Sequence, residues 1–259
     1  MSNPRIFQNT ALTVGETATL TEESFGHVIR VLRHKNGDNI TLFNDQKNNN
    51  TYGEYLGKLV NVSKKSADVI ITHYVEKKVE SPVNIHLAQG ISRGDRMDFT
   101  LQKSVELGVN TITPIFTERC GVKLNAERLT KKHQQWQKIV ISACEQSGRC
   151  TIPIVKEPIL LQTWLAQQSS ALKINLHPKA QHSIMTIPYQ PTVSDDINVK
   201  SLISVRLLIG PEGGLTDDEI TQANKAGFID VLLGPRILRT ETAALTAITA
   251  LQCRFGDLA

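Results

Sequence analysis

The chain has 259 residues, a formal net charge of +4 and an apolar fraction of 40%. That length allows one large domain or two modest ones, and the composition is that of an ordinary soluble globular protein. No apolar run is long enough to span a bilayer, and the N-terminal sequence MSNPRIFQNT lacks the apolar segment of a signal peptide. We therefore expect a cytoplasmic protein, and the slight excess of basic residues favours an anionic partner only weakly.

The cysteines and histidines argue against both a metal site and a disulfide framework. The cysteines are scattered without a C-x-x-C pair, and the seven histidines show no spacing typical of metal ligands. A disulfide framework also needs a short secreted chain. We therefore expect no metal, and free thiols in a reducing cytosol at Cys120, Cys144, Cys150 and Cys253.

The first 75 residues predict short strands separated by turns, with one helical segment at Glu22–Leu32. That segment carries Phe25, Val28 and Leu32 at core spacing. A mostly β segment with one short helix indicates a small barrel, and the charged, Pro-ended stretch Glu76–Pro82 is a plausible domain boundary. The expected strands are Ala18–Leu20, Asn39–Phe43, Tyr52–Val62 and Ala67–Tyr74.

From Val83 onward the pattern changes to strands alternating with helices, which predicts a mainly parallel sheet covered on both faces. One helix opens with a capping box at Thr216–Glu219, and another is stopped by Gly148. The other expected helices are Asp95–Leu107 and one from Thr240 through Phe255. The expected strands are Val83–Ala88, Thr111–Phe116, Leu172–Leu176, Val205–Ile209 and Phe228–Leu233.

Two glycine-proline loops follow two of these strands. Parallel sheets place ligands at the carboxyl ends of their strands, and glycines let a backbone approach a ligand closely. Either loop alone is also compatible with a tight strand-to-helix turn. The dinucleotide and P-loop signatures are both missing, which argues against an ordinary dinucleotide fold and an NTPase. The two loops have the sequences IGPEGGLTDDE (residues 209–219) and LGPRILRTETA (residues 233–243).

These loops, together with QGISRGDRMDFTLQKSVELGV (residues 89–109), resemble the RsmE-type ribosomal RNA uridine-N3 methyltransferases, which belong to the SPOUT superfamily. TERCGVKL, ACEQSGR, PRIF and HVIRVLR extend the resemblance over nearly the whole chain, whereas residues 158–200 match only loosely. The resemblance implies an α/β fold with a C-terminal trefoil knot, in about residues 205–259. It also implies an N-terminal PUA-like β-barrel that binds RNA. The expected domains are residues 1–75 and 76–259.

The resemblance further implies that the glycine-proline loops bind S-adenosylmethionine and release S-adenosylhomocysteine. Adenine needs apolar walls and a few backbone hydrogen bonds, which loops of glycine and leucine can offer. The expected cofactor-binding residues are Leu208, Gly210, Pro211, Gly213, Gly214, Leu233, Gly234, Ile237 and Leu238.

The methyl acceptor, N3 of a uridine, carries a proton and is a poor nucleophile until that proton is lost. Arg239 can stabilise the resulting anion by donating to a ring carbonyl oxygen, but a guanidinium is a poor base. Glu241 and Glu106 are the candidate bases, although a carboxylate of ordinary pKa, about 4.3, is weak for this task. Glu241 could instead be a helix-start carboxylate that favours the helix dipole.

Basic side chains are the expected RNA-binding residues. Arg96, Lys103 and Glu106 share one face of a helix, and the alternative there is a solvated face with an i,i+3 ion pair. Phosphate contacts give affinity rather than sequence choice, and ordinary surface charge is the alternative in the N-terminal module. The candidate RNA-binding residues are Arg5, Arg30, Arg33, Arg93, Arg96 and Lys103.

The expected partner is small-subunit ribosomal RNA within an assembled subunit, and the expected oligomer is a homodimer. Two rivals stay open. A non-catalytic RNA-binding assembly factor would show no stabilisation by the cofactor, and a SPOUT enzyme acting on another site, such as a transfer RNA ribose, would leave a different methylated nucleoside. The intact loops count against the first rival, and ILRTETA favours the ring nitrogen over the second.

Overall fold

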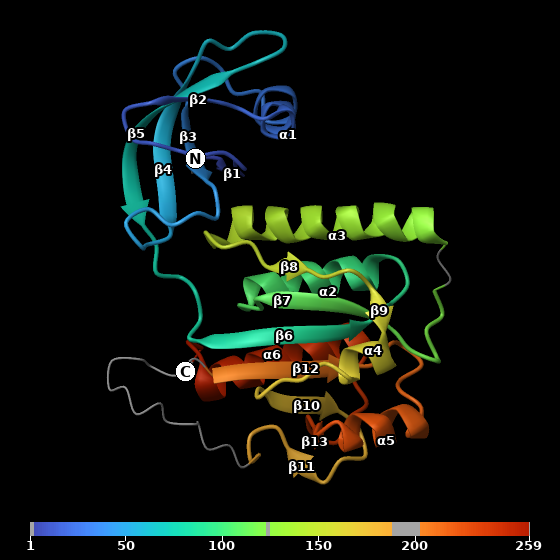
Figure 1. The fold of residues 1–259 in the computed structure, drawn as a ribbon. Coiled ribbons are helices and arrows are strands. Elements are labelled where there is room, and N and C mark those ends of the chain that lie inside the picture. Colours follow the sequence, from blue (N-terminus) through green and yellow to red (C-terminus); the bar gives the residue numbers. More distant parts are fainter. Residues whose placement is uncertain (1–2, 123–124, 188–202, 259) are drawn as a thin grey trace. The chain divides into compact units, whose positions relative to one another are not determined.

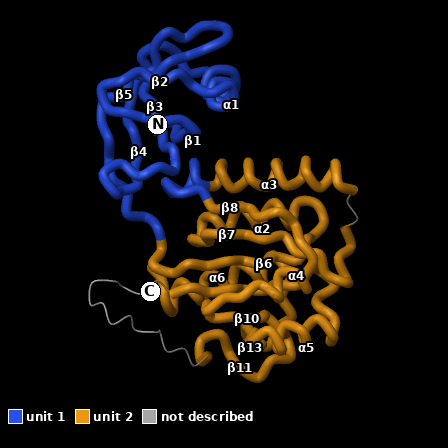
Figure 2. The backbone as a smooth tube through the Cα atoms, in the orientation of Figure 1, with its two compact units in different colours: residues 1–80, 144–152 blue, residues 81–143, 153–259 orange. Residues whose placement is uncertain are grey.

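The computed structural model describes residues 3–122, 125–187 and 203–258. Two compact units make up the chain, as Figure 2 shows. The N-terminal unit comprises residues 1–80 and 144–152, and the C-terminal unit comprises residues 81–143 and 153–259. The structure thus divides the chain between Glu80 and Ser81, a few residues beyond the expected boundary, and assigns a distant nine-residue segment to the N-terminal unit.

The described strands of the N-terminal unit form one sheet in the order β1-β3-β4-β5-β2, with β1 parallel to β3 and the other pairs antiparallel. Sequence patterning missed the three-residue strand β1, which is too short to show an alternation. The strands are β1 (Arg5–Phe7), β2 (Thr17–Thr19), β3 (Asn39–Phe43), β4 (Gly53–Val60) and β5 (Asp68–Glu76).

The predicted helix over Glu22–Leu32 is only partly correct. A short α-helix, α1 (Glu22–Phe25), is followed by a π-helical segment, η1 (Gly26–Val31). In that segment the amide of Leu32 donates to the carbonyl of His27, five residues back, instead of four. This wider turn rotates Leu32 off the core face, so that it is exposed while Phe25 and Val28 are buried.

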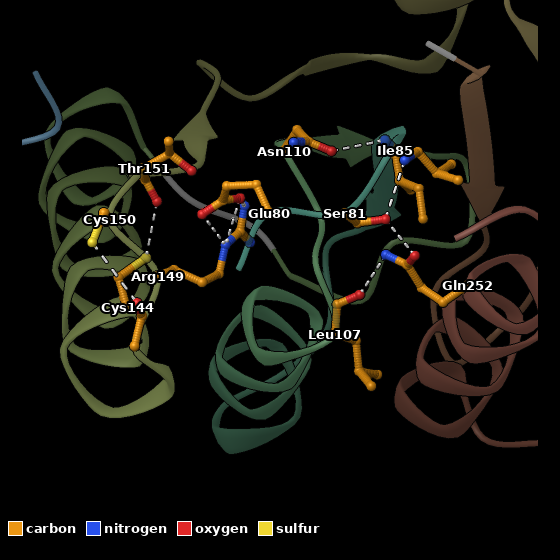
Figure 3. Close-up of polar contacts among 12 residues, drawn as sticks. Glu80, Ser81, Ile85, Leu107, Asn110, Cys144, Arg149, Cys150, Thr151 and Gln252 are labelled. Carbon is orange, nitrogen blue, oxygen red and sulfur yellow. Dashed lines mark hydrogen bonds and ion pairs between the residues drawn. The ribbon is translucent and has the colours of Figure 1, made fainter. Parts of the chain in front are cut away.

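Arg5, expected from the sequence to bind RNA, instead uses its donors within the N-terminal unit. Its guanidinium pairs with Glu54, donates to the carbonyls of Cys144 and Arg149, and lies 4.0 Å from the centre of the Phe43 ring. The side chain is only 12% exposed. Its donors therefore join β1 to residues 144–152, the segment in which Arg149 in turn pairs with Glu80 at 2.6 Å (Figure 3).

Replacing Arg5 by alanine should destabilise the N-terminal unit by about 3 kcal/mol, since removing one partner leaves a buried carboxylate and carbonyls unpaired. Lys77 still pairs with Glu54 at 3.2 Å, which keeps the loss at the low end of its range. The midpoint of thermal unfolding measures the effect. Arg30→Ala is the matched control, because Arg30 is exposed over the Phe25 ring at 5.3 Å. Equal midpoints for the two variants would contradict the assigned role.

The described strands of the C-terminal unit are all parallel and follow the order β11-β13-β10-β12-β6-β7-β8, with β9 also paired to β7 (Figure 1). The predicted parallel sheet is therefore confirmed, and β10 lies between β12 and β13. The strands are β6 (Val83–Gly90), β7 (Thr111–Phe116), β8 (Ile154–Val155), β9 (Ile159–Leu160), β10 (Leu172–Leu176), β11 (His182–Ser183), β12 (Ile203–Ile209) and β13 (Ile229–Leu232).

Helices cover both faces of this sheet. Adjacent residues of β6 point to opposite faces, because Ala88 packs in a core cluster with Trp164 of α4, whereas Gln89 contacts Thr240 of α6. On the α6 side, Gln252 bridges Ser81 and the Leu107 carbonyl at the end of α2 (Figure 3). The helices are α2 (Asp95–Glu106), α3 (Ala126–Ser147), α4 (Leu161–Leu165), α5 (Asp217–Lys225) and α6 (Thr240–Phe255).

A buried basic cluster lies beneath α4. The guanidinium of Arg206 lies 3.9 Å from the centre of the Trp164 ring and donates to the carbonyls of Trp164 and Gln167. His86 meets the same Trp164 edge-on and is 2.7 Å from the Thr113 hydroxyl. Burial, and then the charges of Arg206 and Lys156, lower the pKa of His86 to about 4. His86 is therefore neutral at physiological pH.

This pKa predicts a loss of stability in mild acid. The unfolded chain takes up the proton near pH 6.5 and the folded chain only near pH 4, so the free energy of unfolding falls between these values as the pH drops. The full loss is about 3 kcal/mol. His86→Gln, which does not titrate, should lose correspondingly less stability when thermal unfolding is measured across that range. Parallel losses in both proteins would contradict the assignment.

Candidate functional site

A cavity of about 540 Å³ opens at the carboxyl edge of the parallel sheet. Both glycine-proline loops line it, together with the loop that follows β10. Ligands of open α/β sheets bind at this edge, and the volume is typical of small-molecule sites. The two loops singled out in the sequence are therefore brought together although Gly214 and Gly234 lie 20 positions apart along the chain.

Close backbone packing holds the first loop against the end of β6. A Cβ atom on Gly90 would lie 2.7 Å from Cδ of Pro211 and 2.8 Å from the carbonyl carbon of Gly210. Only glycine permits that approach. The loop then ends in the predicted capping box, where Thr216 and Glu219 exchange hydrogen bonds at the start of α5. Glu219 also accepts from the Glu118 amide at 2.8 Å, which ties the loop after β7 to the same place.

Glu212, which sequence reasoning did not single out, ties the first loop to the start of α2. Its carboxylate accepts from the Arg93 amide at 3.0 Å and from the Arg96 guanidinium at 3.4 Å. Arg96 lines the cavity, and Arg119 lines it too while donating to the carbonyl of Gly213. Several arginines therefore stand around a site whose expected substrate is anionic RNA.

The loop after β10, His177–Lys179, forms a third wall that the sequence analysis missed. It belongs to residues 158–200, which resemble the family only loosely. Residues 188–200 of this stretch lie outside the described part of the chain. The strand itself was predicted, at Leu172–Leu176. Its pairing with both β12 and β13 was not, and that pairing brings its carboxyl end to the site.

The second loop leads directly into α6, and Arg239 is its N-cap residue. The Arg239 side chain is exposed and lines the cavity, where the anion-stabilising role was expected. Glu241 lies in the first turn of α6, and its Oε2 atom is buried without a hydrogen-bond partner among the described residues. Ile237 in the same loop is 87% exposed at the cavity wall.

Other expected site residues lie elsewhere. Leu208 is fully buried in the core beside Trp164 and does not line the cavity, because side chains along β12 alternate in direction. Glu106 is ten residues beyond Arg96 on α2, about 15 Å along the helix, and pairs with Lys103 at 2.7 Å. That pair is the ion pair considered as the alternative. The remaining expected cofactor residues line the cavity: Gly210, Pro211, Gly213, Gly214, Leu233, Gly234, Ile237 and Leu238.

The lining fits S-adenosylmethionine in its chemistry. Glycines give access to backbone donors and acceptors, and leucine and isoleucine side chains of the second loop give apolar contact for a purine. Cationic side chains at Lys179 and Arg236 are available to the carboxylate of an amino acid. Within the described residues, no group of three or more potential metal ligands occurs, and no described helix is long and apolar enough to cross a membrane.

Two family models match most of the chain. The RNA methyltransferase domain matches residues 79–252, and the RNA methyltransferase PUA domain matches residues 20–72. The fold and the cavity together are those of an RNA methyltransferase with a PUA module.

Relatives narrow this class. Ribosomal RNA small subunit methyltransferase E of Buchnera aphidicola is 40% identical over 98% of both chains, and that of Bacillus subtilis is 30% identical over 91% of this chain and 89% of its own. The structure of the enzyme of that name from Neisseria gonorrhoeae, solved with S-adenosyl methionine, is 40% identical in sequence and has a TM-score of 0.87. A putative methyltransferase of Legionella pneumophila, solved with the same cofactor, is 42% identical and has a TM-score of 0.90. Both structures cover 100% of each chain.

The chain belongs to the ribosomal RNA small subunit methyltransferase E family. This confirms the family resemblance and the expected combination of a PUA-like module with an α/β methyltransferase domain. The trefoil knot stays a prediction.

Proposed function

We propose that this protein transfers the methyl group of S-adenosylmethionine to N3 of a uridine in small-subunit ribosomal RNA. The observation that carries the proposal is the cavity at the sheet edge, where both glycine-proline loops meet Arg239. Bound there, the cofactor supplies an electrophilic methyl group on a sulfonium. The N3 proton leaves to a base, the N3 electron pair bonds to the methyl carbon, and the sulfur keeps the electrons of the broken bond, which gives S-adenosylhomocysteine.

Arg239 stabilises the negative charge that develops on the uracil ring. Its guanidinium is permanently charged and donates hydrogen bonds in a planar fork that suits a ring carbonyl oxygen. Donors placed in advance at the site of developing charge are among the largest contributions to catalysis. Arg96 and Arg119 hold the phosphates beside the target nucleotide, a role supported by their position in the cavity lining.

Glu241 is the base that the arrangement favours. It lies two residues after Arg239, beside the residues that line the cavity, and its buried Oε2 atom has no hydrogen-bond partner among the described residues. Glu106, the other candidate, is paired with Lys103 at the opposite end of α2. Glu241→Gln, which keeps the shape and removes the basic oxygen, distinguishes the two.

The remaining parts of the proposal concern partners and location. The PUA-like module, residues 1–75, binds the ribosomal RNA of an assembled subunit in the cytoplasm, with Arg30 and Arg33 exposed for phosphate contact. The enzyme works as a homodimer. The 87% exposure of Ile237 at the cavity wall supports this assignment, because a second copy would cover that apolar side chain. Sedimentation at increasing protein concentration tests the oligomeric state.

The decisive experiment is the transfer of labelled methyl from S-adenosylmethionine to unmodified small ribosomal subunits, followed by mass spectrometry of the nucleosides. One new N3-methyluridine is the expected product, and a 2′-O-methyl nucleoside would instead identify the rival SPOUT reaction. Cofactor binding by calorimetry without transfer would mean that another RNA is the substrate. Neither binding nor transfer would leave the non-catalytic RNA-binding factor.

A further inference from the structure

A buried chain of hydrogen bonds connects three segments around the site. Gln89, near the end of β6, is fully buried, and its Nε2 donates to the Thr240 hydroxyl at 2.9 Å. Thr240, the first residue of α6, is 6% exposed and donates in turn to the Gly210 carbonyl at 2.6 Å. Gly210 and Thr240 both line the cavity. The chain therefore runs from the core of the sheet to the loop expected to hold the cofactor.

The donors and acceptors fix the direction of this chain. A hydroxyl has a single proton, and the nitrogen of an amide side chain can donate but cannot accept. Because the Thr240 oxygen accepts from Gln89, its own proton is directed to the Gly210 carbonyl. The orientation of that carbonyl and the start of α6, where Arg239 is the N-cap, are thus set together.

Gln89 is also an unusual residue for its place. Its Oε1 atom is buried without a hydrogen-bond partner among the described residues, although leaving a buried acceptor unpaired is destabilising. An apolar residue of the same size would fill the position without that penalty. The donors on Nε2, which reach the Thr240 hydroxyl and the Gly90 carbonyl at 3.1 Å, are the feature that only the amide provides.

We propose that Gln89 is a positioning residue for methyl transfer, acting through Thr240 to hold the Gly210 carbonyl and the N-terminus of α6 in register. This inference rests on the function proposed above for the cavity. In this inference Gln89, which does not line the cavity, couples the first glycine-proline loop to Arg239. The two segments are not consecutive in the sequence, so a contact between them is needed to fix their relative position.

Gln89→Glu tests the direction of the hydrogen bonds from Gln89 through Thr240 to Gly210, with almost no change in side-chain shape. An ionised carboxylate only accepts, so it takes the Thr240 proton away from the Gly210 carbonyl. At about pH 8 we expect the cofactor Kd to rise about tenfold, with a fall in kcat of similar size. At about pH 5.5 the buried carboxyl, whose pKa burial raises, is protonated and donates again, so both losses shrink. Glu241, which adjoins Thr240 on α6, and His86 on β6 are the other ionisable groups nearby, and wild type measured in parallel is the control for both.

Three further variants separate positioning from packing. Thr240→Val removes the hydroxyl at constant shape and should weaken cofactor binding about tenfold, whereas Thr240→Ser keeps the hydroxyl and should recover most of that loss. Gln89→Met should reproduce the loss without the dependence on pH. Thermal unfolding shows that each variant is folded, and the two Thr240 variants decide the matter if a Gln89 variant is not.

Calorimetry of cofactor binding keeps this test independent of the RNA substrate. If wild type binds S-adenosylmethionine but methylates another position, the function proposed above fails. The effect of the Gln89 and Thr240 variants on the cofactor Kd can still be measured. Wild-type cofactor affinity and turnover in Gln89→Glu at both pH values would overturn the inference. So would equal losses in Thr240→Ser and Thr240→Val.

Discussion

Arg239→Ala should lower methyl transfer about a thousandfold while leaving the affinity for S-adenosylmethionine within about threefold of wild type. The guanidinium is expected to act on the uracil anion, which exists only as the reaction proceeds. Its loss therefore raises the barrier without removing a contact to the bound cofactor. Single-turnover transfer to ribosomal subunits measures the chemical step, and calorimetry measures the cofactor Kd.

Two variants sharpen this result. Arg239→Lys keeps the positive charge but replaces the planar fork by a single ammonium, so it should recover part of the lost rate. Arg236→Ala removes a neighbouring arginine that also lines the cavity, and should lower the rate less than about tenfold if position rather than net charge matters. Near-wild-type transfer by Arg239→Ala would exclude the assigned role. A large rise in the cofactor Kd would instead move Arg239 to cofactor binding.

Local patterning predicted those elements whose signals lie within a few residues. The strands β7 and β10 and the helix α6 begin and end at the predicted residues, because a continuous buried run marks each strand and a sustained apolar face marks the helix. The capping box at Thr216 gave the start of α5 for the same reason. The π-helical turn after Phe25 was missed, since its sequence has the same apolar spacing as an α-helix.

The site could be predicted only as far as two loops and a family pattern. The sequence of a single strand does not reveal which strands lie beside it in the sheet. The position of the loop His177–Lys179 at the cavity therefore could not be predicted. The packing of Arg5 could not be predicted, because a basic residue near the N-terminus has the same sequence signal whether it faces solvent or, as here, Glu54 and the 144–152 segment. The burial of Leu208 could not be predicted either, because consecutive side chains at the end of a strand point alternately to opposite faces of the sheet.

Gly90→Ala should abolish cofactor binding by displacing the first glycine-proline loop. The new methyl group would lie 2.7 Å from Cδ of Pro211 and 2.8 Å from the carbonyl carbon of Gly210, and neither is the flexible end of a side chain. Either β6 or the loop must therefore shift. Because β6 is paired on both sides in the centre of the sheet, the loop is the part that moves. We expect the cofactor Kd to rise at least about a hundredfold, measured by calorimetry.

Gly26→Ala is the matched control for this substitution. A Cβ atom on Gly26 meets nothing within 4 Å, and this glycine has helical dihedral angles. Alanine there should leave cofactor binding unchanged and stabilise the N-terminal unit by up to about 1 kcal/mol. Thermal unfolding of Gly90→Ala should show a folded protein whose midpoint no longer rises when S-adenosylmethionine is added, because a ligand stabilises only a state that binds it. A normal rise of the midpoint in Gly90→Ala would mean that the contact between β6 and the loop yields without cost, and that the close approach of Gly90 to Pro211 does not shape the cofactor site.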